Sequence, residues 1–197
     1  MTARKEAILK AAANLFAERG FNETSMAELA KVTGVAQGTI FYHFNNKEEL
    51  FLTVLDDFKT SITQEFENHI KEKNFTTGLE KVEGALNFYL YLAGSMEERF
   101  RILHRHHAYE LARINPVCRV HLESIYSCLV DIFEKAILLG QQDGSIREMD
   151  ARKAALIIYT MVDGLVRFNT YDLYDGGVLS NELFESCRRI LENNKSC

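Results

Sequence analysis

The stretch that most constrains the fold is residues 24–47, TSMAELAKVTGVAQGTIFYHFNNK. Ser25, with Glu28 three residues later, is typical of a capping box at the start of a helix. Gly34 follows one short helix later, where a tight turn needs a residue that tolerates a positive φ. Apolar side chains on both sides of the turn can pack two helices together: Met26, Leu29, Ala30, Val35 and Ile40. The spacing therefore predicts a helix-turn-helix.

The second helix of this motif, about residues 36–44, leaves polar side chains off its packing face: Gln37, Thr39, Tyr42 and His43. Glutamine pairs with adenine in bidentate fashion, and threonine reaches base edges or phosphates. Phenol and imidazole groups contact phosphates, and Gly38 lets the backbone approach a duplex. Lys47 lies in the first turn of the next helix, where backbone N–H groups favour an anion. These residues predict an interface with double-stranded DNA, although a helical hairpin without that function could show the same spacing.

The run GVAQGTIFYHFNNKEEL at residues 34–50 resembles the TetR family of bacterial repressors. The preceding helix fits the same pattern, because it is followed by Glu-Arg-Gly-Phe and has an apolar face formed by Ile8, Leu9, Ala12, Leu15 and Phe16. The resemblance covers residues 4–55, and beyond them it is architectural. It implies that two groups of side chains contact DNA. Phosphate contacts are expected from Thr24 or Ser25, Tyr42, His43 and Lys47, and base contacts from Gln37 and Thr39.

Two positions depart from the family's usual pattern. Phe41 stands where the family often has tyrosine, so the phosphate contact there is in doubt and Tyr42 gains importance. Gln37 stands where lysine is common, which weakens non-specific attraction to phosphates and favours base readout. The resemblance also implies an all-α fold of about nine helices. Residues 1–47 would form a three-helix DNA-binding domain, and residues 48–197 a helical domain for effector binding and dimerisation.

Capping residues and apolar periodicity divide the rest of the chain into helices. Thr77 with Glu80, Asn115 before a proline, and Asp150 are predicted to mark helix starts. The predicted helices span about residues 47–73, 77–93, 96–114, 116–139, 150–171 and 180–193, with a polar loop at 140–145. The first of them carries a continuous apolar stripe and is long enough to transmit a change from one domain to the other.

The charge of the chain agrees with a DNA-binding protein once it is divided along the sequence. Residues 1–47 carry six Lys or Arg and four Asp or Glu, a net of +2, whereas residues 48–197 carry 17 and 24, a net of −7. The mild positive charge is confined to the motif, and the remainder favours a small-molecule role over contact with DNA. A single proline and the absence of tryptophan, with frequent Ala, Leu, Glu and Lys, favour an all-α protein.

The last two predicted helices are strongly amphipathic. In the TetR family these helices pair with their copies, which implies dimer contacts here at Ile158, Val162, Leu165, Phe184, Cys187 and Leu191. Packing within the chain explains the same stripes, and the pattern alone does not choose between them. Function favours a homodimer, because two recognition helices about 34 Å apart read a palindrome whereas a single one reads few base pairs.

Aromatic residues are frequent between residues 88 and 174, and most are expected in the core. The resemblance implies an effector cavity among the helices at about 77–140 and 150–174, where buried tyrosine hydroxyls need polar partners. The expected effector is an apolar or amphipathic small molecule. Asp163 and Arg167 are four residues apart, and an ion pair between them is favoured over a contact with the effector. Candidate effector contacts are Tyr89, Phe100, His104, His107, Tyr126, Tyr159 and Arg167.

Other functions have weaker support. His104, His107 and Glu110 share one face of the helix expected over residues 96–114, which would suit a metal ion, while Arg105 or the histidines would suit an effector carboxylate. A polar cluster is the plainer interpretation. With no glycine-rich phosphate loop and no paired nucleophile and base, we expect no enzymatic activity, no metal and no cofactor. The helix-turn-helix could instead bind a protein partner.

The sequence also bears on the compartment in which the protein works. No segment resembles a signal peptide, and no stretch approaches the roughly 18–20 apolar residues that span a bilayer. We therefore expect a cytoplasmic protein without membrane contact. The four cysteines lie far apart and without a Cys-x-x-Cys pattern, so reduced thiols are expected at Cys118, Cys128, Cys187 and Cys197.

Overall fold

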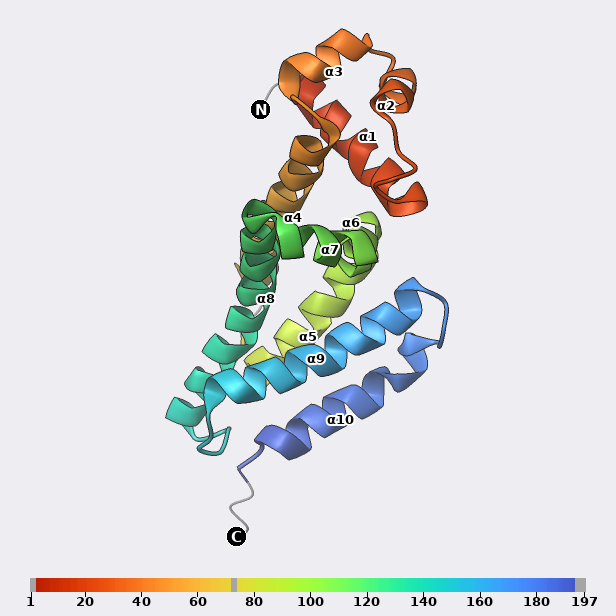
Figure 1. Ribbon diagram of the computed structural model, residues 1–197. Helices are drawn as coiled ribbons and strands as arrows, with labels where there is room; N and C mark the ends of the chain where they lie inside the picture. Colours follow the sequence, from red (N-terminus) through yellow and green to blue (C-terminus); the bar gives the residue numbers. More distant parts are fainter. Residues whose placement is uncertain (1–2, 72–73, 194–197) are drawn as a thin grey trace. The chain divides into compact units, whose positions relative to one another are not determined.

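The computed structural model describes residues 3–71 and 74–193, and helices joined by short loops make up this part of the chain (Figure 1). The α-helices there are α1 (Ala3–Arg19), α2 (Met26–Thr33), α3 (Gln37–His43), α4 (Lys47–Lys71), α5 (Gly78–Ser95), α6 (Glu97–His104), α7 (His106–Ile114), α8 (Pro116–Asp143), α9 (Ala151–Thr170) and α10 (Ser180–Leu191). A short 3-10 helix, η1 (Gly176–Leu179), precedes α10. The predicted all-α fold is confirmed, and none of the described helices is long and apolar enough to cross a membrane.

The helices form two compact units. The first contains residues 1–61 and 96–125, and the second contains residues 62–95 and 126–197. Because the division passes through α4 and α8, each of these long helices contributes to both units. The first unit thus joins the helix-turn-helix to α6, α7 and the start of α8. The predicted boundary after residue 47, between a DNA-binding domain and an effector-binding domain, stays a prediction.

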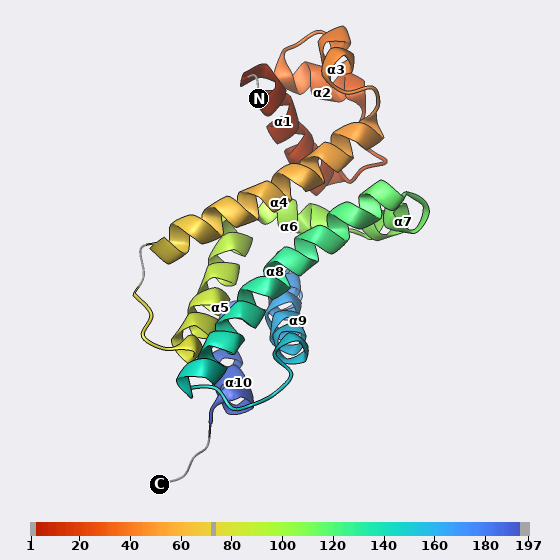
Figure 2. The same cartoon turned by 90° about the vertical axis from the view of Figure 1, so that its left-hand side faces the viewer.

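The core of the first unit forms on α1, whose predicted apolar face is buried. The five side chains of this face are at most 5% exposed: Ile8, Leu9, Ala12, Leu15 and Phe16. α1 packs against α2 and α6, and α2 and α3 lie beside it in two views (Figures 1 and 2). The ring of Phe16 meets that of Phe51 in α4 edge-on, with centroids 5.5 Å apart. Burial of this face holds α1, α2, α3 and the start of α4 together, and we call these elements the head.

Side-chain caps place four helix starts where the sequence predicts them. Backbone N–H groups of the first turn donate to the side chains of Ser25, Thr77, Asn115 and Asp150 over distances of 2.8–3.2 Å. The first N–H groups of a helix have no partner within it, so these bonds fix where α2, α5, α8 and α9 begin.

In the second unit α9 packs against α5 and α10, and α9 and α10 run side by side (Figure 1). The buried face of α9 includes Ala155, Ile158 and Val162, each fully buried. Across from it, α10 buries Leu183, Cys187 and Leu191. The amphipathic stripes of the last two helices therefore form the core of this unit.

Two of the predicted helices differ clearly from those in the structure. The helix expected over residues 96–114 is divided into α6 and α7, because Arg105 has an extended backbone with φ −74° and ψ 144°. α8 continues to Asp143, through most of the loop expected at 140–145, and the Asp143 carboxylate accepts the N–H of Gly78 at the start of α5 at 2.6 Å. The end expected for α4 at Lys73 lies outside the described residues.

The described cysteines, Cys118, Cys128 and Cys187, are free thiols. Burial raises the pKa of both Cys118 and Cys187 to about 11, with a smaller contribution from Glu48 at Cys118. These two thiols stay protonated at neutral pH and are inert packing groups. Cys197 lies outside the described residues.

Candidate nucleic-acid interface

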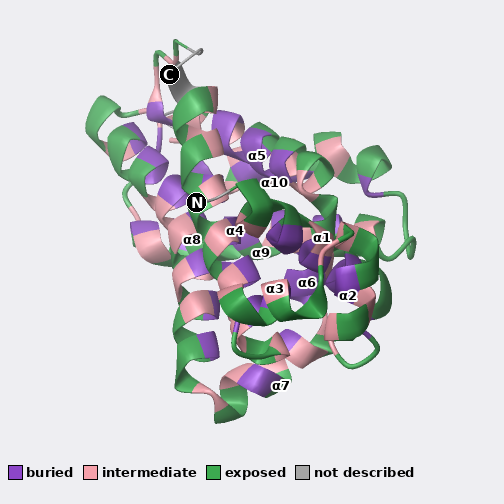
Figure 3. Cartoon of the chain, turned by 90° about the horizontal axis from the view of Figure 1, so that it is seen from above, coloured by how far each residue is buried: buried purple, intermediate pink, exposed green. Residues whose placement is uncertain are grey.

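α3 has one face in the core and one in solvent. Ile40 and the following Phe44 are 0% and 1% exposed, whereas Tyr42 is 83% exposed. In the view onto α3, much of this helix is coloured as exposed (Figure 3). Phe41 is 43% exposed and offers only its ring. The structure brings the predicted DNA-contacting side chains of α3 onto one accessible helix, with Gln37 and Gly38 exposed and Thr39 and His43 half-buried.

The turn that presents α3 depends on Gly34. This residue has φ 68° and ψ 18°, the left-handed conformation that the sequence predicts, and its N–H donates to the carbonyl of Ala30. The N–H of Val35 donates to the same carbonyl at 3.2 Å. Because a residue with a Cβ rarely adopts this conformation, Gly34 fixes how α3 leaves α2.

The sequence leaves Thr24 and Ser25 as alternative phosphate contacts, and the structure separates them. Thr24 is 3% exposed, and its hydroxyl points to the carbonyl oxygens of Gly20 at 2.8 Å and Leu15 at 3.2 Å. A hydroxyl has one proton, so Thr24 has none to offer a phosphate. The Ser25 hydroxyl accepts the N–H of Glu28 at 3.1 Å and keeps its proton for another acceptor. The expectation therefore narrows to Ser25.

The Lys47 ammonium group faces inward, toward the turn between α1 and α2. It donates to the carbonyl oxygens of Phe21 at 2.7 Å, Thr24 at 2.8 Å and Asn22 at 3.3 Å. It also lies 4.4 Å from the centroid of the Phe21 ring. Burial lowers the pKa of Lys47, while nearby Glu23 acts in the opposite direction. An ammonium group has three donors, and all three are directed at carbonyls, so here Lys47 orders the turn instead of facing a phosphate.

The break at Arg105 separates the histidines that the sequence places on one helical face. His104 ends α6 and meets the Phe100 ring edge-on, whereas His107 lies in the first turn of α7 and stacks on Phe21 with centroids 4.0 Å apart. Glu110 pairs with His106 at 2.9 Å rather than with these histidines. No group of three or more potential ligands in the described residues is placed to hold a metal ion. The single face expected for His104, His107 and Glu110 is therefore divided, because His104 lies in α6 and the other two residues lie in α7.

Four candidate effector residues gather around Asp163 in the second unit. The Tyr89 hydroxyl donates to Asp163 Oδ1 at 2.6 Å, and Tyr159 meets both Tyr89 and Tyr126 edge-on. Arg167 Nη2 lies 3.5 Å from Asp163 Oδ2, which confirms the expected ion pair. Burial raises the pKa of Tyr89 well above its usual value of 10, and Tyr159 and Asp163 add to the effect. The other candidates lie in the first unit: Phe100, His104 and His107.

The side chains predicted at a dimer interface point into the chain's own core. Ile158, Val162 and Leu191 are 0% exposed. Cys187 is 2% and Leu165 8% exposed, and only Phe184 of the predicted set is half-buried. A fully buried side chain offers no surface to a second copy, so packing within the chain, the alternative left open by the sequence, accounts for Ile158, Val162 and Leu191. The dimer contacts as a set stay a prediction.

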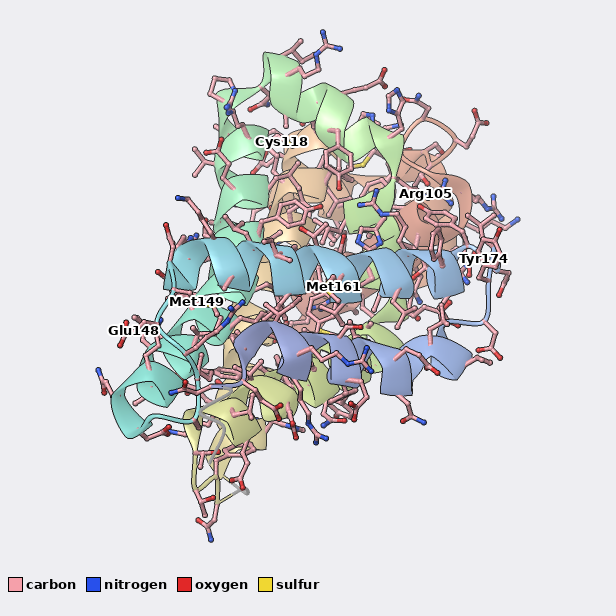
Figure 4. The ribbon with its side chains drawn as sticks, turned by 90° about the horizontal axis from the view of Figure 1, so that it is seen from below. Arg105, Cys118, Glu148, Met149, Met161 and Tyr174 are labelled. Carbon is pink, nitrogen blue, oxygen red and sulfur yellow. The ribbon has the colours of Figure 1, made fainter. Side chains whose placement is uncertain are left out.

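The opposite side of α9 carries a second apolar stripe that this chain leaves exposed. Leu156, Ile157 and Phe168 are 46%, 54% and 42% exposed. The half-buried Met161 lies midway along the helix in the view onto α9 and α10 (Figure 4). Ile157, Met161 and Phe168 are four and seven residues apart, a spacing that matches one face of a helix.

A cavity of about 310 Å³ lies in the second unit where α5 begins and α8 ends. It has both polar and apolar walls, formed by Phe75, Thr76, Thr77, Gly78, Lys81, Leu139, Gln142 and Asp143. No candidate effector residue lines it. Its place in the fold therefore differs from that of the tyrosine cluster around Asp163.

Two residues that build the first unit have contacts that no local sequence pattern reveals. Phe21 receives both the Lys47 ammonium and the His107 ring on its aromatic ring. Arg105 donates to the carbonyl oxygens of Ala17 and Glu18, which are 88 and 87 residues earlier in the chain. A local pattern cannot reveal pairs this distant, and Arg105 was identified only as a possible carboxylate ligand.

Comparisons with known proteins agree with this architecture. Residues 8–54 match the family model of bacterial regulatory proteins, tetR family. The chain is 29% identical over 183 residues to the fatty acid metabolism regulator protein of Bacillus subtilis (strain 168), with 90% of each chain covered. The structure of FadR from Bacillus subtilis in complex with stearoyl-CoA gives a TM-score of 0.75 at 28% identity, over 94% of this chain and 98% of that one. A transcriptional regulator from Saccharomonospora viridis in complex with choline gives 0.83 at 20% identity, over 96% and 98%, and shows a shared fold.

Proposed function

The chain belongs to the TetR family of bacterial regulatory proteins, and we propose that it is a ligand-responsive repressor that binds a palindromic operator as a homodimer. It is a transcriptional regulator and not an enzyme. The observation that carries the proposal is the exposure of α3, which is held on a buried Ile40 and a left-handed Gly34. This arrangement suits a short helix that enters the major groove.

We assign two tasks to the accessible side chains of the head. Gln37 and Thr39 read base edges, and Gly38 allows close approach of the backbone. Tyr42, His43 and the Ser25 hydroxyl donate to phosphates and fix the register of the head on the duplex. Each task rests on side chains whose exposed atoms are not required for packing.

A homodimer would use the exposed stripe of α9. Leu156, Ile157 and Phe168 present apolar side chains that the chain's own helices do not cover. Covering them with a second copy removes apolar surface from water, which favours association. Two heads would then contact half-sites about one helical turn apart, and a palindromic operator follows from the two-fold symmetry.

The effector we propose is an amphipathic small molecule that lowers operator affinity. Support comes from the similar FadR, which was solved in complex with stearoyl-CoA. The tyrosines around Asp163 supply ring surface and hydroxyl groups in the second unit, a composition that suits such a ligand. Release of DNA requires a coupling free energy, typically about 1–3 kcal/mol. The protein would act in the cytoplasm, with its DNA.

The test is selection of genomic fragments by the purified chain, read by sequencing. We expect enrichment of a short palindrome, and loss of that enrichment for a Gln37→Ala, Tyr42→Ala variant of unchanged helical content. Stearoyl-CoA and choline are then added separately to the complex with the selected duplex. A selection without any enriched sequence, with and without these ligands, would contradict operator binding.

A further inference from the structure

The C-terminal end of α1 is held by a cation from a distant part of the chain. The Phe16 carbonyl accepts the N–H of Gly20 at 3.0 Å. The next two carbonyl oxygens, of Ala17 and Glu18, accept instead from Arg105 Nη2 at 2.5 and 3.0 Å. The last carbonyls of a helix lack partners within it and carry partial negative charge. A guanidinium group is therefore well suited to cap this end.

The break between α6 and α7 is what brings Arg105 to α1. Arg105 is the last residue before α7 and has an extended backbone, so its side chain leaves the helical path (Figure 4). Gly20, with φ 88°, has no side chain in the way, since a Cβ there would lie 3.2 Å from Arg105 Nη1. Two residues later, His107 stacks on Phe21 at an angle of 11°. The break thus supplies two successive contacts to the same end of α1.

α6 is also fixed to α4 at its other end. Arg99 Nη2 lies 2.6 Å from Asp57 Oδ2, and Arg99 Nη1 donates to the Ser61 hydroxyl at 2.5 Å. Between these contacts Phe100 meets Phe58 of α4 edge-on, with centroids 5.4 Å apart. α6 consequently ties α4 to α1 by a path that does not pass through the core of the helix-turn-helix.

We propose that Arg105 is a positioning residue for operator binding, which sets the orientation of the head by capping α1. It acts through α1 and does not touch DNA. In a dimer, the orientation of each head decides the distance between the two recognition helices, and hence the half-site spacing that both can occupy. The inference rests on the dimeric operator binding proposed above. It adds a residue outside positions 1–47 to those that determine which operators are bound.

The test uses full-length Arg105→Gln, Arg105→Lys and Arg101→Gln proteins. Arg101 is the matched control, because it lies in α6, its side chain is 40% exposed, and it pairs along its own helix with Glu97. The probes are the selected operator, duplexes whose half-sites are moved apart or together by single base pairs, and one isolated half-site. Affinity is measured by fluorescence anisotropy of labelled duplex over a range of salt concentrations.

We expect Arg105→Gln to weaken binding to the selected operator on the order of tenfold and to flatten the preference among spacings. Affinity for the isolated half-site and the salt dependence stay as in the unchanged protein, because no phosphate contact is lost. Arg105→Lys restores part of the spacing preference, since its ammonium can still cap a carbonyl. Arg101→Gln behaves as the unchanged protein.

Several outcomes would overturn the inference. An unaltered spacing preference in Arg105→Gln removes the positioning role, and a salt slope lowered by about one places Arg105 on a phosphate. An equal loss on the operator and the isolated half-site indicates damage to the head itself. Should Arg105→Gln not fold by circular dichroism, Arg105→Lys decides, because a spacing preference identical to that of the unchanged protein refutes the proposal. If the unchanged protein itself has no preferred half-site spacing, the proposal of dimeric operator binding is refuted, and the role of Arg105 is refuted with it.

Discussion

α3 and the turn between α1 and α2 lie in the same small head, and DNA contacts are expected from both by resemblance to the TetR family, yet they direct their polar side chains oppositely. On α3, Tyr42 is 83% exposed. In the turn, Thr24 is 3% exposed, and the Lys47 ammonium group donates to three backbone carbonyls of the turn. A matching sequence position therefore does not settle whether a side chain contacts DNA or shapes the surface that does.

The two regions should respond differently to substitution. A side chain on the exposed face of α3 makes few contacts in the free protein, so its loss affects DNA affinity with little change in stability. A side chain that bonds the turn's carbonyls leaves these acceptors without that partner when it is removed, so its loss first lowers the free energy of unfolding. Measuring both quantities for each variant tests this division.

The largest effect is expected within α3 itself. Ile40→Ala should lower the free energy of unfolding by about 2–5 kcal/mol, because it opens a cavity under the helix. Tyr42→Ala, two residues later, should change it by no more than about 0.5 kcal/mol and still weaken operator binding. Urea unfolding followed by circular dichroism suits this chain, which has no tryptophan. A large loss of stability in Tyr42→Ala would break the comparison.

Lys47→Met should lower the free energy of unfolding by about 1–3 kcal/mol, since three carbonyl oxygens lose their shared donor. Lys31→Met is the matched control, because Lys31 is exposed in the last turn of α2. Operator affinity measured against salt gives the second readout. The slope for Lys47→Met should equal that of the unchanged protein, and a decrease of about one would return Lys47 to the phosphate contacts.

Ser25 has two roles, as the cap of α2 and as a proposed phosphate contact, and two substitutions separate these roles. Ser25→Ala removes the cap of α2 and should cost about 1 kcal/mol, whereas Ser25→Gly should cost only a few tenths. Both remove the hydroxyl proton that we assign to a phosphate, so both should weaken operator binding to a similar extent. If operator affinity followed stability, with Ser25→Gly close to the unchanged protein, Ser25 would act as a cap alone.

The features that could be predicted from sequence have causes within a few residues. The caps at Ser25, Asn115 and Asp150 each join a side chain to an N–H two or three residues later. Gly34 is a similar case, because the conformation of a single residue makes the turn. The break at Arg105 has no such cause, since the carbonyls that its side chain reaches belong to residues 17 and 18.

The residues of a dimer interface are hard to predict for a different physical reason. Apolar periodicity reveals that a helix has an apolar face, but it does not identify what covers that face. On α9 there are two apolar stripes: Ile158 and Val162 are covered by the chain's own helices, whereas Leu156 and Ile157 are exposed. The ion pair between Asp163 and Arg167 was predicted correctly, because their four-residue spacing places both on one face of a helix.

The smallest expected effect is a pH dependence that belongs to the turn and not to α3. Burial lowers the pKa of His107 from its usual 6.5; Lys47 acts in the same direction, while Glu110 and Glu48 oppose it. The unfolded chain then binds more protons than the folded one between the two pKa values, so stability rises with pH through this window. Stability is complete above about pH 6.5 and is lost as pH falls through the lower, folded value.

His107→Phe isolates this contribution, because it keeps a ring to stack on Phe21 and removes the titrating group. Melting temperatures of both proteins are measured by circular dichroism between about pH 5 and 8. Every titratable group except His107 is present in both proteins, so the effects of those groups cancel in the difference. The difference in melting temperature should therefore be constant above pH 6.5 and shift in favour of His107→Phe below it. Parallel curves would mean that His107 takes up its proton without disturbing the stack, and a shift in the opposite direction would mean that protonation strengthens it. In either case the predicted pH dependence would not distinguish the turn from α3, and the contrast between them would rest on Thr24 and Lys47.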